Sequence, residues 1–264
     1  MDPAALMDFL GFSTGEVERA ALVLARISGL FLSAPFFSRT VGPLTIRAAL
    51  VMTLTLVLFP LVPHWPHEGE GNPFLLAFAA VSELLIGAIM GMLAHWVLVA
   101  VQVAGSIIGF EMGLSMAMVM DPTSGLQEGV ISNMLYMAAL MIFLGIDGHH
   151  ILIDGLARSF HSFPPGHTLP SGQGLVQSAV SALGQLFQFS LLLSAPIVVS
   201  SKLLYLGMGL INRASPQIQV FFVSMPIAQL MGFFILGLSM MVFGQVLTEQ
   251  IEAFTNLAFK VAGL

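Results

Sequence analysis

Long stretches of this sequence contain no charged residue. No Asp, Glu, Lys or Arg occurs between Glu83 and Glu111, between Glu128 and Asp147, or between Arg213 and Glu249. Each stretch is near or above the roughly 20 residues that an α-helix needs to cross a bilayer. The chain is 57% hydrophobic and 8% charged, whereas a soluble globular domain carries about 25% charged residues. Because so little charge cannot cover a water-facing surface, we predict a polytopic membrane protein.

The apolar stretches are continuous and rich in Leu, Ala, Met and Gly. A membrane β-barrel would instead show ~10-residue segments that alternate between apolar and polar residues. We therefore predict an all-α fold of about six kinked hydrophobic helices, delimited by turn and breaker residues. The expected helical blocks are 17–37, 44–63, 74–110, 126–146, 175–211 and 217–250.

Two loops interrupt these blocks, at residues 63–73 and 161–174, and both are rich in proline. The second loop separates four shorter blocks from two long ones, and it is the best candidate for an internal boundary. Six crossings with positively charged loops inside the cell would place the odd-numbered loops, which include Arg39 and Arg213, in the cytoplasm and both termini in the periplasm.

Several residues are unfavourable in a helix surrounded by lipid. Arg26, Glu83 and Lys202 lie within apolar blocks, where each needs a partner, water, or a route to the headgroups. Three further features indicate helices that pack against other helices. They are a polar stripe (Gln177, Ser181, Gln185 and Gln188), two internal prolines (Pro196 and Pro226) and a close-packing pair of glycines (Gly87 and Gly91).

The composition and motifs argue against several classes of function. A formal net charge of -6 without basic clusters gives no support for nucleic-acid binding. The sequence has no phosphate loop, nucleophile elbow or zinc-protease motif, so we expect neither an enzyme nor a cofactor. His149 and His150 are flanked by Asp147 and Asp154. Because neighbouring residues on a helix point about 100° apart, this pair is a poor chelate, hydrogen bonding at a helix end is favoured, and no metal site is expected.

The segment from Gly105 to Pro122 is the most unusual part of the sequence. Glycine recurs every fourth residue at Gly105, Gly109 and Gly113, and methionine every fourth at Met112, Met116 and Met120, with Met118 between them. Methionine is flexible and polarizable, and such a cluster commonly fills gaps in a membrane-protein core. Glycine lowers helix stability by up to ~1 kcal/mol relative to alanine. The segment is therefore either core packing or a deformable closure of a pore.

This segment and others resemble the FliR family of flagellar type III export-gate proteins. The central similarity comprises Gly109, Phe110, Glu111, Met112, Gly113, Leu114, Ser115, Met116, Ala117, Asp121, Pro122, Gly125, Phe143, Leu144, Gly148, His149 and His150. An early segment, Arg26 to Phe37, and a late one, Asn212 to Phe221, are similar as well. The resemblance covers nearly the whole chain, and its Met-Gly-Leu-Ser core favours the flagellar branch over the virulence injectisome branch.

The resemblance implies a hetero-oligomeric subunit in the bacterial cytoplasmic (inner) membrane, at the flagellar basal body. Residues 1–170 would form a FliP-like four-helix part and residues 171–264 a FliQ-like helical hairpin. The subunit would form a channel with FliP and FliQ for unfolded flagellar export substrates, and would engage FlhB and FlhA.

The same resemblance assigns roles to individual residues. The plug segment, 105–122, would help to close the channel. Its plug residues are Gly109, Phe110, Glu111, Met112, Gly113, Leu114, Ser115, Met116, Met118 and Met120, with Asp121 and Pro122 as anchor. The turn residues Asn212, Arg213, Pro216 and Gln217 would contact FlhB. The competing hypothesis is a secondary transporter, which also uses broken helices and intramembrane charges; no matching pair of interrupted segments supports it.

Overall fold

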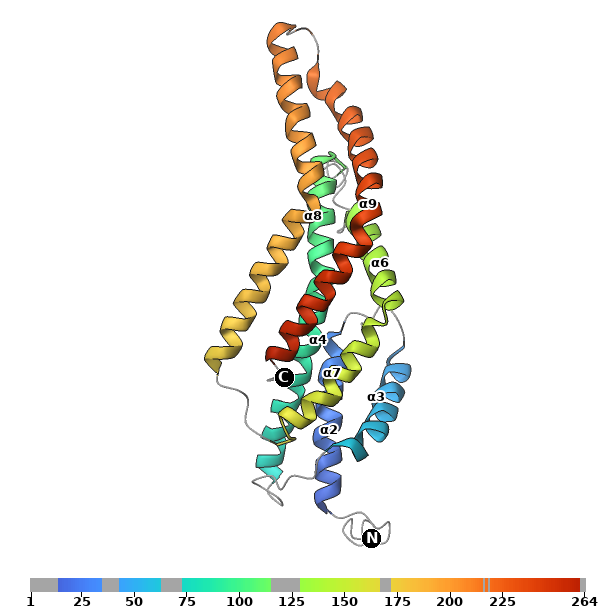
Figure 1. Ribbon diagram of the computed structural model, residues 1–264, viewed down its shortest axis with the longest axis vertical. Coiled ribbons are helices and arrows are strands. Elements are labelled where there is room, and N and C mark those ends of the chain that lie inside the picture. The colour runs from blue at the N-terminus through green and yellow to red at the C-terminus, as the bar shows by residue number, and fades with distance from the viewer. Residues whose placement is uncertain are drawn as a thin grey trace. The chain divides into compact units, whose positions relative to one another are not determined.

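A computed structural model of the chain describes residues 14–34, 43–62, 73–114, 129–166, 172–215, 217 and 219–261. All regular structure within these ranges is helical (Figure 1). The α-helices are α2 (Thr14–Ser33), α3 (Leu44–Leu58), α4 (Pro73–Glu111), α6 (Val130–Gly145), α7 (Gly148–Ser162), α8 (Gly172–Ala214) and α9 (Val220–Val261), and the 3-10 helix η2 (Phe59–Leu61) extends α3. The predicted all-α fold of a polytopic membrane protein is confirmed.

Helix α7 was not predicted from the sequence. It lies where the prediction left residues 147–160 unassigned and began a loop at 161. Only one face of α7 is apolar, with Leu152, Leu156 and Phe160 buried, while Asp154 and Arg158 are exposed. An amphipathic helix of this kind does not produce a continuous apolar stretch, which explains why the search for such stretches missed it.

Fewer helices qualify as membrane spans than the six crossings that the orientation prediction assumed. Within the described ranges, 44–61, Pro73–Glu111, Ala179–Ala214 and Phe222–Ile251 are long and apolar enough, and α6 with α7 adds a fifth only if they form one broken span. Helix α2 does not qualify, since it carries Glu16, Glu18, Arg19 and Arg26. The predicted orientation of the chain stays a prediction.

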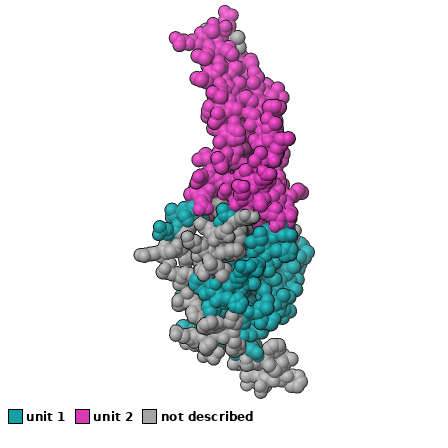
Figure 2. Space-filling model, in the orientation of Figure 1, with its two compact units in different colours: residues 1–95, 147–182, 252–264 teal, residues 96–146, 183–251 magenta. Residues whose placement is uncertain are grey.

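The chain forms two compact units (Figure 2). The first comprises residues 1–95, 147–182 and 252–264, and the second comprises residues 96–146 and 183–251. Helices α4, α8 and α9 contribute to both units. The predicted division into residues 1–170 and 171–264 follows the order of the chain instead, and it stays a prediction.

Glycines bring α2 and α4 together in the first unit. A methyl group on Gly87 would overlap the carbonyl oxygen of Arg26, and one on Gly29 would overlap that of Leu84. Gly91 is similarly close to Ser33. The pair Gly87 and Gly91 therefore acts as the close-packing device that the sequence predicted.

The same helix interface contains a fully buried ion pair. The Nε of Arg26 donates to Oε2 of Glu83 at 2.5 Å, and its two terminal nitrogens donate to Ser159 Oγ (3.1 Å) and the Phe163 carbonyl oxygen (2.9 Å). The backbone N–H of Gly166 donates to the other Glu83 oxygen at 3.0 Å. These bonds connect α2, α4 and α7 with the turn that follows α7. Of the alternatives that the sequence left open for Arg26 and Glu83, the structure shows pairing, and each is the other's partner.

Hydroxyl groups and a glycine link the helices of the second unit. Ser190 of α8 donates to the Ala100 carbonyl oxygen of α4 at 2.9 Å, and Ser132 of α6 donates to that of Gln102 at 2.7 Å. A methyl group on Gly105 would come within 2.5 Å of the Ser132 Cα, so α4 and α6 pack backbone to backbone there. Pro196 lies inside α8 and Pro226 inside α9, as predicted.

Candidate functional site

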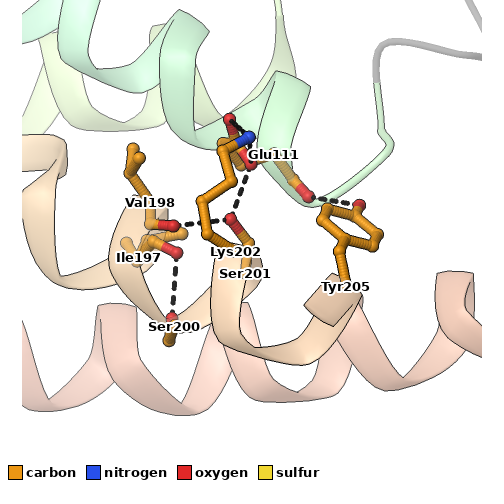
Figure 3. Close-up of polar contacts among 7 residues, drawn as sticks. All are labelled: Glu111, Ile197, Val198, Ser200, Ser201, Lys202 and Tyr205. Atoms are coloured by element: carbon orange, nitrogen blue, oxygen red, sulfur yellow. Dashed lines mark hydrogen bonds and ion pairs between the residues drawn. The ribbon is translucent and has the colours of Figure 1, made fainter. Parts of the chain in front are cut away.

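The last turn of α4 is held against α8 by a polar cluster around Glu111 (Figure 3). The Lys202 Nζ lies 2.7 Å from Oε1 and 2.9 Å from Oε2 of the Glu111 carboxylate. Ser201 Oγ donates to Glu111 Oε2 at 2.6 Å, and the Tyr205 hydroxyl donates to the Glu111 backbone carbonyl oxygen at 3.2 Å. One turn of α8 thus satisfies both the side chain and the free carbonyl at the end of α4.

The two charges of this cluster differ in exposure. The Glu111 side chain is 10% exposed and that of Lys202 is 62% exposed. A carboxylate removed from water in this way is costly unless it is paired and hydrogen-bonded, and Glu111 is both. Of the alternatives that the sequence left open for Lys202, the structure shows a partner, Glu111. Glu111 had been predicted only as part of the plug segment.

Met112, which follows Glu111, packs against helix α9. The Met112 side chain is buried, and a methyl group on Gly232 of α9 would come within 2.5 Å of Met112 Cγ. Gly113 has a φ of +73°, a conformation that favours glycine, and lies close to the Met225 side chain of α9. The chain therefore leaves α4 with one residue fixed on α8 and the next on α9. Met112 packs inside the protein, as the core-filling interpretation of the methionines expected for it.

Phe110 differs from its neighbours because its side chain is 72% exposed. Gly109 has open space where a Cβ would lie, and Leu114 is half-buried. The other predicted plug and anchor residues lie outside the described part of the chain: Ser115, Met116, Met118, Met120, Asp121 and Pro122. Of the described plug residues, Phe110 is the one whose large side chain is available to another molecule.

The turn predicted to contact FlhB follows the end of α8. Asn212 and Arg213 lie in the last turn of α8 and are exposed, as is Gln217 after it. Pro216 lies outside the described residues. The described residues of this set therefore present one guanidinium and two amides on the surface of the second unit.

Ser201 and Tyr205 are the residues of the Glu111 cluster that sequence reasoning missed. They are four residues apart in α8 and therefore share a helix face, with Lys202 beside Ser201. A lysine with two hydroxyl-bearing neighbours at helical spacing in an apolar block was a usable signal. It could have predicted a buried carboxylate as partner, although it could not have selected Glu111.

The helices contain two internal ion pairs, Arg26 with Glu83 and Lys202 with Glu111. Together with the long apolar helices, these pairs indicate a polytopic membrane protein that has polar contacts between its helices. The model of the family described as bacterial export proteins, family 1, matches residues 17–254. The flagellar biosynthetic protein FliR of Bacillus subtilis is 32% identical over 89% of this chain and 93% of its own length. That of Escherichia coli is 33% identical over 79% of each chain.

A relative with a different name is also similar over most of its length. The surface presentation of antigens protein SpaR of Salmonella typhimurium is 26% identical over 94% of this chain and 90% of its own. The family model and the FliR relatives together cover most of the sequence. The chain therefore belongs to the FliR family of bacterial export proteins.

Proposed function

We propose that this chain is a structural subunit of the flagellar type III secretion export gate, in the cytoplasmic membrane at the basal body. With FliP and FliQ it forms the channel for unfolded flagellar proteins, and it contacts FlhB and FlhA. The observation that carries this proposal is the similarity to FliR proteins along most of both chains. The higher identity to flagellar relatives than to the SpaR relative supports the flagellar branch.

Within this gate, the plug segment closes the channel from a fixed base. Glu111 and Met112 are the base, since one is bonded to α8 and the other packs on α9. Exposed Phe110 and the following residues Met116, Met118 and Met120 provide the apolar obstruction. A fixed base supports this role because a closure that must re-form after each export event needs a reproducible starting position.

Removing the plug segment tests this role. Deletion of Phe110 to Met120 should raise ion leakage across the membrane, measured as conductance in cells that assemble the complex. Phe110→Ala should raise leakage to a smaller extent. Phe234→Ala is the matched control, since Phe234 is 69% exposed in the same unit but lies on α9 outside the segment. Normal assembly with unchanged conductance in the deletion variant would rule out a plug.

The base can be tested separately by unbalancing its charges. Lys202→Met leaves the carboxylate of Glu111 without its cation, so the segment should loosen and leakage should rise. The double variant Glu111→Gln with Lys202→Met removes both charges and should restore a tight barrier. Equal leakage in the single and double variants would show that charge balance at this site does not hold the segment.

Co-purification separates the export gate from the transporter hypothesis. An export-gate subunit should purify with FliP and FliQ, whereas a secondary transporter should purify alone and bind a small solute. Isolation of a stable, solute-binding protein without those partners would overturn the proposed function.

A further inference from the structure

A carboxylate and two imidazoles converge where α6 ends and α7 begins. One ligand atom from each of Asp147, His149 and His150 can be chosen so that all three lie within 4.8 Å of one another. The two imidazole centroids are 4.1 Å apart. It is the one such group found among the described residues. The sequence had suggested diverging histidines, but side-chain rotation brings the rings together despite the helical offset.

The backbone at Asp147 explains this convergence. Asp147 has φ 57° and ψ 31°, and is the one non-glycine residue with positive φ in the described ranges. It occupies the N-cap of α7, yet its side chain makes no capping hydrogen bond. Its carboxylate oxygen Oδ1 instead lies 3.2 Å from His150 Nδ1. The left-handed turn therefore points the carboxylate at the imidazoles rather than at the N–H groups of the helix.

We propose that Asp147, His149 and His150 form a binding site for a divalent transition-metal ion of the Zn²⁺ class. Imidazole nitrogens and carboxylate oxygens are ordinary ligands of such ions, and three protein ligands leave a fourth position for water. With metal–ligand distances of about 2.0–2.1 Å, a tetrahedral site needs ligand atoms about 3.3 Å apart.

Small side-chain rotations can close that geometry. Asp147 and His150 are exposed, so their rotation meets little steric resistance. The positive end of the α7 dipole disfavours a cation, and the negative charge of Asp147 at the N-cap offsets this effect. The same carboxylate supplies the charge that two neutral imidazoles lack.

Metal titration tests the site directly. The full chain, purified in detergent without a polyhistidine tag, should be titrated with Zn²⁺ by calorimetry and with Co²⁺ by visible absorption. We expect one saturable ion per chain. Loss of an outer-shell partner, which only orients a metal ligand, typically lowers metal affinity about 10–100-fold. Loss of a ligand itself in His150→Ala should therefore weaken binding by at least ~10-fold. Asp147→Asn should also weaken it, while asparagine still tolerates the left-handed backbone.

The control is His161→Ala, which removes an exposed histidine at the other end of α7. The chain has 7 histidines, so an ion bound elsewhere must be distinguished. His161→Ala should leave the affinity unchanged. Absence of saturable binding, or equal affinity in the wild type and in His150→Ala with intact helicity, would overturn the proposal and leave a hydrogen-bonded histidine at a helix start.

Discussion

Replacing Arg26 by methionine should destabilise the first unit strongly, because it leaves the carboxylate of Glu83 buried without its cation. Removal of one partner from a buried ion pair destabilises a protein by about 3–5 kcal/mol. Both side chains are buried almost completely. The Gly166 N–H would still donate to Glu83, whereas Ser159 Oγ and the Phe163 carbonyl oxygen would lose the donors that Arg26 supplies. We therefore expect a loss of free energy of unfolding in the upper part of that range.

A double variant separates the unpaired charge from the loss of packing. Arg26→Met combined with Glu83→Leu removes both charges and keeps apolar side chains of similar length at the site. Replacement of a buried pair by apolar residues is often neutral or stabilising. The Gly166 N–H and the Phe163 carbonyl would still lose their partners, at about 1–3 kcal/mol each if they stay buried. The double variant should consequently be more stable than Arg26→Met, and its deficit should come from the backbone groups.

Unfolding by SDS in mixed micelles, followed by circular dichroism, measures these free energies. Glu83→Leu alone completes the cycle, since it is the second single change contained in the double variant. The coupling energy between positions 26 and 83 should exceed 2 kcal/mol on the scale of about 0.5–3 kcal/mol seen for contacting residues. Additive effects of the two single changes would refute the argument, because they would show that the ion pair adds nothing beyond packing.

Two further predictions concern packing and topology. Gly87→Ala should destabilise the protein although alanine is favoured by about 1 kcal/mol in a helix, since the new methyl group overlaps the Arg26 carbonyl oxygen. Gly237→Ala, with open space around it, should be neutral or stabilising in the same unfolding measurement. A cysteine at exposed Ala214 should react with a membrane-impermeant thiol reagent only from the cytoplasmic side. Labelling solely from the periplasm would contradict the predicted orientation.

The helices that could be predicted from this sequence are those that consist almost entirely of apolar residues. Helix α4 was predicted as 74–110 and runs from Pro73 to Glu111, because the sequence between Glu83 and Glu111 is almost continuously apolar and carries no Asp, Glu, Lys or Arg. Helix α7 could not be found in this way. Its polar face is exposed and its apolar face packs inside the first unit, so its hydropathy is that of an ordinary amphipathic helix.

Charge partners were beyond the reach of the sequence for a different reason. The need of Arg26 and Lys202 for partners followed from their apolar surroundings, but the partners lie 57 and 91 positions away along the chain. Only the packing of helices selects one carboxylate among several. The exposed Phe110 beside the buried Met112 likewise depends on how α4 is rotated about its own axis, and the helices that pack against it determine that rotation.

The two ion pairs differ in a way that predicts different consequences of breaking them. Arg26 is sheltered completely, so its loss affects the free energy of unfolding first. Lys202 keeps most of its side chain exposed, so water screens this pair more than it screens Arg26 and Glu83, although Glu111 itself is only 10% exposed. Lys202→Met should therefore destabilise the isolated chain less than Arg26→Met does, while raising ion leakage more in the assembled complex. If Arg26→Met both destabilised the chain more and raised ion leakage more than Lys202→Met, global stability alone would explain the leakage. The cluster around Glu111 would then have no separate role in holding the plug segment.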